Sequence, residues 1–374
     1  RAVKQKNTNI NINAADKDGN TPLHDACLQK YPEIVQLLLE HPNINYRIVN
    51  QKGRNVFHQA CFNDISNNVL RYLVEHCNDL DINARDINGR TVAHFVAANG
   101  CKESLDYLIK LGNVDFQAPG QCGFTPLHYA CRQPYNSYIN TKKLLKSIQP
   151  DVNLQTSSGW TALHLACRNA SKTTVDLLLK YNASIQLRGN DGRTPFHFAV
   201  LNNNQRGFPG SVIESFAKEH PDMVNLQSKD GKTFLHLICE NNGYAMLRFL
   251  IDCDFCSLLD FNALTNDGLT PLHIATKNGH VKVVKLLLEN STRLKIIVND
   301  KMLSTIAHDN GHQNVVNVIE LWHSKYQKGS KGSRGSKRLE RRERLENLER
   351  LERLKRLEIL KSRRLRSTRN HTES

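Results

Sequence analysis

The sequence has no run of roughly 20 apolar residues, the length that a membrane-spanning helix requires. Its first residues do not form the charged and then apolar segment of a signal peptide. Motifs of catalysis are missing as well: there is no Gly-rich phosphate loop, no G-x-S-x-G elbow, no H-E-x-x-H pair and no paired carboxylates in a recognisable setting. These absences predict a soluble, non-catalytic chain that needs no cofactor and no metal.

A four-residue phrase recurs along the chain instead. Its copies are Thr21–His24, Asn55–His58, Thr91–His94, Thr125–His128, Thr161–His164, Thr194–His197, Thr233–His236 and Thr270–His273. Successive histidines are 34, 36, 34, 36, 33, 39 and 37 residues apart. Self-similarity at about 33 residues indicates stacked helix-turn-helix units, each of which packs on its neighbours.

Each copy of the phrase has the residues that begin a helix. In Asp18-Gly19-Asn20-Thr21-Pro22, Asp-Gly favours a tight turn, Thr caps a helix, and Pro fits the first helical position, where no backbone N–H is needed. A second, strongly apolar helix follows, as in Ile34–Leu39. Such a helix has to be buried by stacking.

This combination of phrase, turn glycine, leucine block and period resembles the ankyrin repeat over residues 14–322. The resemblance implies an all-α solenoid of helix pairs with β-hairpin or loop fingers, acting as an interaction module. Asp300–Leu321 lacks the phrase and reads as a degenerate C-terminal capping repeat. Because Ile12-Asn13-Ala14 matches the repeat junction Ile82-Asn83-Ala84, we expect residues 1–13 to end a preceding repeat or extension, and the natural protein to continue upstream.

The repeated histidines and cysteines have structural explanations. In ankyrin repeats the histidine bridges the backbone and the Thr hydroxyl, and eight copies on different repeats do not form one active site. Five cysteines share one position after the phrase and are predicted to be buried packing residues: Cys27, Cys61, Cys131, Cys167 and Cys239. The others show no disulfide spacing, so free thiols in a reducing compartment are expected. Cys253 and Cys256 have the spacing of half a zinc site, but nothing completes four ligands.

The residue between the turn glycine and the cap differs from copy to copy, and we call it the variable finger residue. It is Asn20, Arg54, Arg90, Phe124, Trp160, Arg193, Lys232 and Leu269 in turn. Aromatic and arginine side chains dominate binding hot spots. We therefore predict that Arg90, Phe124, Trp160, Arg193 and Lys232 contact a partner protein, although bulky residues here also shield the turn.

The positive charge of the chain is concentrated in its tail. Residues 323–374 hold 18 Lys and Arg against 7 Asp and Glu, which leaves 33 against 29 for residues 1–322. Residues 323–337 read as a flexible Gly/Ser linker, 338–366 as an Arg/Leu/Glu-rich low-complexity helix and 367–374 as a disordered end. Leucines at every third residue circle a helix, so a solitary charged helix is favoured over a coiled coil.

Basic clusters in the tail leave its role open. The candidate residues for binding a polyanion or directing the chain to the nucleus are Lys337, Arg338, Arg341, Arg342, Lys361, Arg363, Arg364 and Arg366. No aromatic residue lies among them, so a contact with nucleic acid would be to phosphate. A merely solvated tail is the alternative.

The sequence thus predicts a monomeric protein-binding scaffold in the cytoplasm or nucleus. Two other functions stay open. The chain could regulate nucleic acid or an anionic membrane through its tail, or its repeats could target a larger enzyme or channel encoded upstream.

Overall fold

The structure is a computed structural model that describes residues 11–330 except 63–67, 100–101, 134–136, 170 and 202–209, and it leaves undescribed the side chains of residues 254, 255 and 326–330. The chain divides into two compact units, Arg1–Leu269 and Thr270–Ser374, which we describe separately. Within the described residues all regular structure is helical. This confirms the predicted all-α class.

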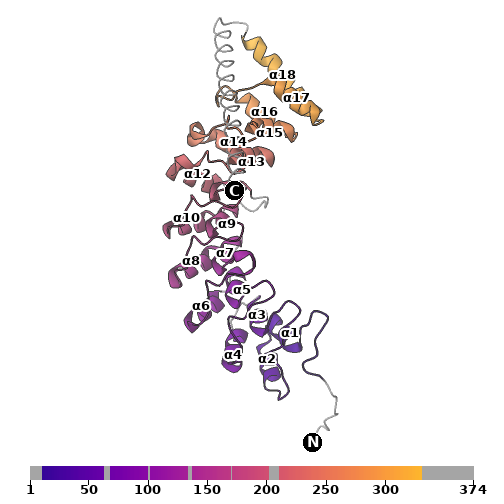
Figure 1. The fold of residues 1–374 in the computed structure, drawn as a ribbon, viewed down its shortest axis with the longest axis vertical. Helices are drawn as coiled ribbons and strands as arrows, with labels where there is room; N and C mark the ends of the chain where they lie inside the picture. Colours follow the sequence, from indigo (N-terminus) through magenta and orange to yellow (C-terminus); the bar gives the residue numbers. More distant parts are fainter. Residues whose placement is uncertain are drawn as a thin grey trace, which may run out of the picture. The chain divides into compact units, whose positions relative to one another are not determined.

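The first unit contains seven helix pairs that follow one another in chain order (Figure 1). They are α1 (Pro22–Gln29) and α2 (Pro32–Leu39), α3 (Val56–Cys61) and α4 (Asn68–His76), α5 (Val92–Asn99) and α6 (Lys102–Leu111), α7 (Pro126–Arg132) and α8 (Ser137–Ser147), α9 (Ala162–Arg168) and α10 (Lys172–Lys180), α11 (Pro195–Ala199) and α12 (Gly210–Glu219), and α13 (Phe234–Glu240) and α14 (Tyr244–Asp252). Three short 3-10 helices, η1 (Gln121–Gly123), η2 (Pro221–Met223) and η3 (Asp254–Leu258), lie in the connections.

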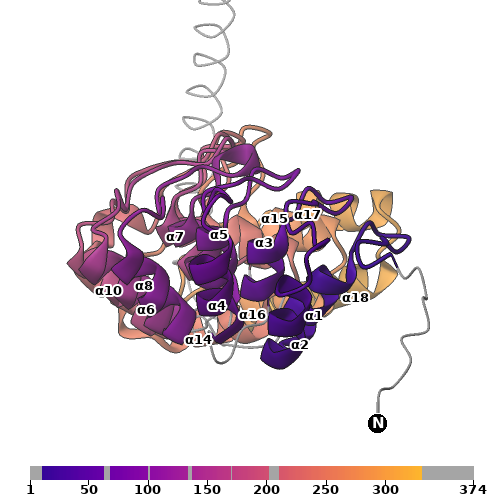
Figure 2. The same cartoon turned by 90° about the horizontal axis from the view of Figure 1, so that it is seen from below.

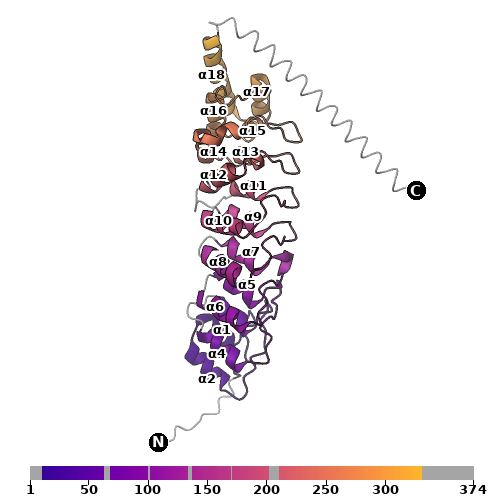
Figure 3. The ribbon, with the colours of Figure 1, turned by 90° about the vertical axis from the view of Figure 1, so that its left-hand side faces the viewer.

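The helices of this unit form two layers. Each first helix packs on the first helix of the next repeat, as α5 does on α7, and second helices such as α8 and α10 pack in the same way. Figures 2 and 3 show the two layers, with the loops between repeats projecting beyond the first helices. We call each of these loops a finger.

The fingers are built from glycine turns. Gly231 has a φ of +78°, which an L side chain adopts only under strain, and a Cβ at this position would lie 2.5 Å from the backbone nitrogen of Asn266 in the next finger. That nitrogen instead donates to the carbonyl of Asp230 at 3.0 Å. Adjacent fingers are joined by equivalent single backbone bonds, such as Gln51 N–H to Asp18 O at 3.0 Å. The fingers are therefore turns, and none of their described residues is in a β-strand as a hairpin would require.

The core consists of the apolar side chains between the two layers and between repeats. Leu70, Leu73, Leu105 and Leu108 of the second helices have no exposed surface. The five cysteines predicted as packing residues are all fully buried, which confirms that prediction. Burial raises the pKa of the Cys131 thiol to about 12, so this thiol stays protonated and behaves as a small apolar group.

The second unit contains α15 (Pro271–Lys277), α16 (Val281–Glu289), α17 (Asp300–Asp309) and α18 (Gln313–Ser330). At the start of α17, where the phrase is missing, the side chain of Asn299 caps the helix by accepting the Met302 N–H at 3.1 Å. The Trp322 indole donates to the Leu288 carbonyl at 2.8 Å and ties α18 to α16. Helix α18 runs to Ser330, eight residues past the boundary predicted at 322, so helix extends into residues predicted as linker.

Candidate protein-binding surface

The histidine of each phrase holds the finger of the following repeat. In the first repeat, His24 Nδ1 accepts from the Thr21 backbone N–H at 3.3 Å and lies 2.9 Å from Thr21 Oγ1, while Nε2 lies 3.1 Å from the carbonyl oxygen of Arg54. A carbonyl oxygen only accepts, so Nε2 carries the proton. The contacts with the backbone and the Thr hydroxyl are those that the resemblance implied, and the imidazole also bridges its helix start to the finger of the next repeat.

The same link recurs through the first unit, and its acceptor is always the variable finger residue. The further pairs are His58 with Arg90, His94 with Phe124, His128 with Trp160, His164 with Arg193, His197 with Lys232, and His236 with Leu269, at 3.0 to 3.2 Å. Only the backbone of the variable residue takes part. Its position is therefore fixed while its side chain is free to differ.

Burial keeps these histidines neutral. It lowers the pKa of His94, His128, His164 and His197 to about 4, because desolvation disfavours the charged imidazole. A proton on Nδ1 would also remove the acceptor of the Thr backbone N–H. The arrangement therefore suits a structural bridge and offers no group poised for acid–base catalysis near neutral pH.

Each aromatic variable residue is half-buried against the helices. Phe124 makes edge contacts with the rings of His128 and Tyr129, at centroid distances of 5.8 and 5.9 Å. Trp160 makes its edge contact with Phe198 at 5.2 Å. The two residues predicted as an aromatic pair thus pack within separate clusters on neighbouring repeats.

The charged variable residues are partly neutralised by neighbours. Arg90 donates to the buried Asp86 carboxylate through Nε and Nη2, at 3.0 and 2.7 Å. Arg193 lies 3.5 Å from Asp191. Lys232 forms a 2.7 Å ion pair with Glu240 and lies 3.5 Å from Asp230. Arg90 and Arg193 thus pair with residues of their own fingers, whereas Lys232 also reaches the end of α13.

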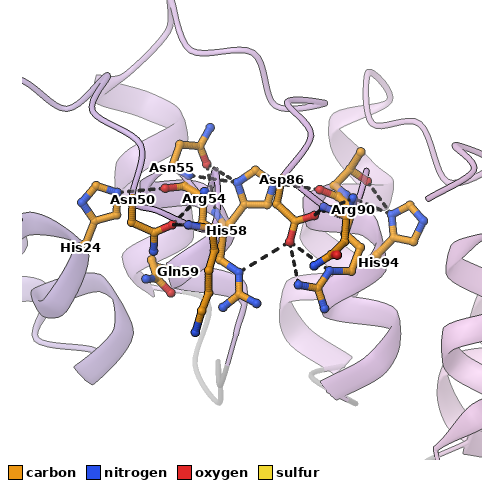
Figure 4. Close-up of polar contacts among 12 residues, drawn as sticks. His24, Asn50, Arg54, Asn55, His58, Gln59, Asp86, Arg90 and His94 are labelled. Atoms are coloured by element: carbon orange, nitrogen blue, oxygen red, sulfur yellow. Dashed lines mark hydrogen bonds and ion pairs between the residues drawn. The ribbon is translucent and has the colours of Figure 1, made fainter. Parts of the chain in front are cut away.

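Two components of this surface were missed by sequence reasoning. In three of the eight copies the residue after the phrase histidine is aromatic, and these residues, Phe95, Tyr129 and Phe198, lie beside the variable residues Arg90, Phe124 and Trp160. The cluster of Arg54, Asp86 and Arg90 in Figure 4 was also missed. Asp86 lies four residues before Arg90, in a turn, so its sequence position alone does not reveal that its side chain is buried between two arginines.

A cavity of about 390 Å³ opens elsewhere in the first unit, between the ends of α4 and α6, and is lined by residues that include Phe57, Cys77, Asp81 and Asn113. Burial raises the pKa of the Cys77 thiol to about 11, which leaves it protonated and unreactive near neutral pH.

Other classes of site are missing from the described part of the chain. No three His, Cys, Asp or Glu side chains there are arranged to hold a metal ion, Cys253 and Cys256 included. None of the described helices has the length and apolar character needed to cross a bilayer. The predicted polyanion-binding residues, Lys337 to Arg366, lie outside the described residues.

Comparison with known proteins places these features in a family. The family described as ankyrin repeats (3 copies) matches residues 2–86, 57–149, 134–208 and 205–300. A putative ankyrin repeat protein of fowlpox virus is 30% identical over 189 residues, covering 50% of this chain and 44% of the viral protein. An ankyrin repeat protein of monkeypox virus is 31% identical over 180 residues, covering 48% of this chain and 30% of that protein.

A third relative is much longer. The human transient receptor potential cation channel subfamily A member 1 is 27% identical over 228 residues, which are 57% of this chain and 18% of the channel. The chain spans less than half the length of these relatives, and the similarity is to repeats. Ankyrin repeats form protein–protein interaction modules. The phrase, the histidine bridges, the helix pairs and the four family matches together show that this chain belongs to the ankyrin repeat family.

Proposed function

We propose that this chain is a non-catalytic adaptor that binds a partner protein on its finger surface, through Arg90, Phe124, Trp160, Arg193 and Lys232. The observation that carries the proposal is the histidine bridge. Each bridge fixes the backbone carbonyl of a variable residue and leaves its side chain partly exposed. A rigid row of differing side chains loses little conformational entropy on binding.

The residue types support this assignment. Phe124 and Trp160 offer large apolar faces at low entropic cost, and Arg90 and Arg193 offer directional donors at either side along the sequence. Partly buried aromatic and arginine side chains are typical anchors of protein interfaces. The stack would therefore bind across several repeats as a rigid body.

Affinity capture on the full chain, followed by mass spectrometry, tests the proposal. We expect a stoichiometric partner whose capture is lost with Trp160→Ala and Arg193→Ala together. The matched control is Arg248→Ala, an exposed arginine on α14 that pairs with Asp252. Equal capture by the double variant and by wild type would contradict the assignment of the surface.

A second candidate function rests on the charge of the tail. Residues 323–374 carry a net charge of +11, from 18 Lys and Arg against 7 Asp and Glu. Such a segment attracts nucleic acid or anionic lipid. Deletion of residues 329–374 should then abolish binding to nucleic acid and to vesicles of anionic lipid. The affinity of the full chain for either ligand should fall steeply as the salt concentration rises. Binding that survives the deletion would contradict it.

A third candidate is that the repeats direct a larger enzyme or channel to its target. The relatives that favour it are the human cation channel and a tyrosine-protein kinase of Hydra vulgaris, of which the chain matches 23%. Sequencing the complete reading frame tests it directly. A catalytic or membrane-spanning region beside the repeats would support it, and an open reading frame limited to repeats and tail would exclude it.

A further inference from the structure

Two arginines, Arg54 and Arg90, lie against the carboxylate of Asp86, which neutralises only one positive charge. Its carboxylate has no exposed surface. Oδ1 accepts the backbone N–H groups of Asn88 and Arg90, both at 2.9 Å, and Oδ2 accepts Arg90 Nε and Nη2. These four bonds occupy the acceptor capacity of the carboxylate. They also hold the pKa of Asp86 below its usual value against the effect of burial.

Arg54 approaches the same carboxylate but is not satisfied by it. Its Nε lies 3.6 Å from Asp86 Oδ2, beyond hydrogen-bond distance, and is buried without a hydrogen-bond partner among the described residues. The guanidinium lies 5.1 Å from the ring centroids of both Phe62 and Phe95. Burial and repulsion by Arg90 lower the pKa of Arg54, although the group stays charged.

Arg54 and Arg90, which we call the arginine pair, both lie against the buried carboxylate of Asp86. Figure 4 shows the two guanidinium groups on one side of Asp86. Arg90 lies 4.9 Å from the centroid of the Phe95 ring that Arg54 also covers. The side chain of Arg54 is 12% exposed and that of Arg90 is 20% exposed. Among the described residues two positive charges face one negative charge, so one positive charge has no ion-pair partner there, where water is partly excluded.

We propose that the arginine pair binds a carboxylate side chain, Asp or Glu, on an acidic segment of the partner protein. The proposal rests on the proposed function and names the chemistry of the partner at one point of the finger surface. A guanidinium fork matches a carboxylate in geometry, and aromatic faces hold the fork flat. A carboxylate supplies one negative charge, whereas a phosphate group supplies nearly two and would leave excess negative charge.

The charges in this cluster are not needed to build the finger. In the preceding repeat Asn50 occupies the position of Asp86, and its Oδ1 accepts the backbone N–H groups of Lys52 and Arg54 at 2.9 and 3.0 Å. An amide therefore makes the same turn. The Asp86 charge serves to hold Arg90, and nothing in its own finger satisfies Arg54 Nε.

This equivalence gives a variant designed to fold. Arg54→Gln with Asp86→Asn and Arg90→Gln removes the buried carboxylate together with its partners, so no uncompensated charge stays inside. The control is Arg47→Gln with Asp79→Asn and Arg248→Gln. It removes the same residue types and the same net charge from an ion pair and an arginine that are largely exposed. Both variants keep the basic tail.

The test pans a display library of random linear peptides against the full chain and both triple variants. Peptides held by the tail will appear with all three proteins. We expect wild type and control to enrich peptides with an Asp or Glu anchor that the cluster variant does not retain. A synthesised peptide from this group should lose about tenfold to a hundredfold in affinity when its anchor becomes Gln.

Two outcomes contradict the inference in different ways. Peptides specific to the finger surface, lost with Trp160→Ala but lacking an acidic anchor, would overturn the arginine pair as a carboxylate site and leave the proposed function standing. Acidic peptides retained equally by the cluster variant would do the same. A library that enriches nothing beyond the peptides held by the tail would overturn both proposals.

Discussion

The phrase histidines and the variable finger residues share one hydrogen bond, but they differ in almost every other respect. His128 and His164 are almost completely buried, whereas Trp160 and Arg193, whose carbonyls they hold, are partly exposed. The bond joins a side chain to a backbone atom. The identity of the histidine is therefore fixed by folding, while the identity of the side chain on the other partner is not. This difference predicts that stability and the proposed recognition are separable within a single finger.

We expect the largest effect on stability from lowering the pH, which protonates the phrase histidines. Five phrase histidines, His94, His128, His164, His197 and His273, have folded-state pKa values of about 4. Because the unfolded value is about 6.5, the unfolded chain binds more protons between these limits. The free energy of unfolding should fall as the pH drops from about 6.5 to about 4, at up to about 1.4 kcal/mol per histidine and pH unit. Urea denaturation followed by circular dichroism measures this.

The pH window distinguishes histidines from carboxylates. Asp86 has a pKa below its usual value and titrates at lower pH than the histidines. A urea midpoint that stays constant from pH 7 to pH 4.5 and falls only below that would assign acid sensitivity to carboxylates and contradict the histidine account.

A single histidine gives the next largest effect. His164→Ala leaves the Thr161 N–H and the Arg193 carbonyl without their partner and opens a void. We expect a loss of about 3 kcal/mol in the free energy of unfolding. His76→Ala, an exposed histidine near the end of α4, is the control and should cost less than about 0.5 kcal/mol. Similar losses for both would show that the bridge contributes nothing specific.

Substitution of a glycine where two fingers approach closely should reduce the free energy of unfolding by a smaller amount. Gly231→Ala brings a Cβ against Asn266 N, whereas Gly268 has nearly the same φ, +76°, and nothing within 4 Å of its Cβ position. Gly268→Ala therefore carries backbone strain alone, about 1 kcal/mol, and Gly231→Ala should exceed it by a further 1 kcal/mol or so. Thermal unfolding of the two variants compares them. Equal melting temperatures would show that fingers do not touch as described.

The sequence predicted most of the scaffold because each repeat has to solve the same folding problem. Thr161 and His164 could be assigned from their spacing, and Cys167 from its repeated position. The candidate site was less predictable. Aromatic contacts such as Trp160 with Phe198 join residues of different repeats, and the shortfall of acceptors around Arg54 depends on side-chain geometry. Periodicity identifies what repeats have in common, whereas the proposed binding surface consists of what differs between them.

The most direct measurement compares Trp160→Ala with His164→Ala in parallel, by urea midpoint and by affinity for the captured partner. The account predicts that Trp160→Ala weakens binding at least about tenfold while changing the free energy of unfolding by less than about 1 kcal/mol, since hot-spot side chains contribute mainly to binding. For His164→Ala it predicts a large loss in the free energy of unfolding and a smaller loss in affinity for the partner. Equal losses of stability in the two variants, with partner binding unaffected by Trp160→Ala, would contradict the separation of scaffold from recognition.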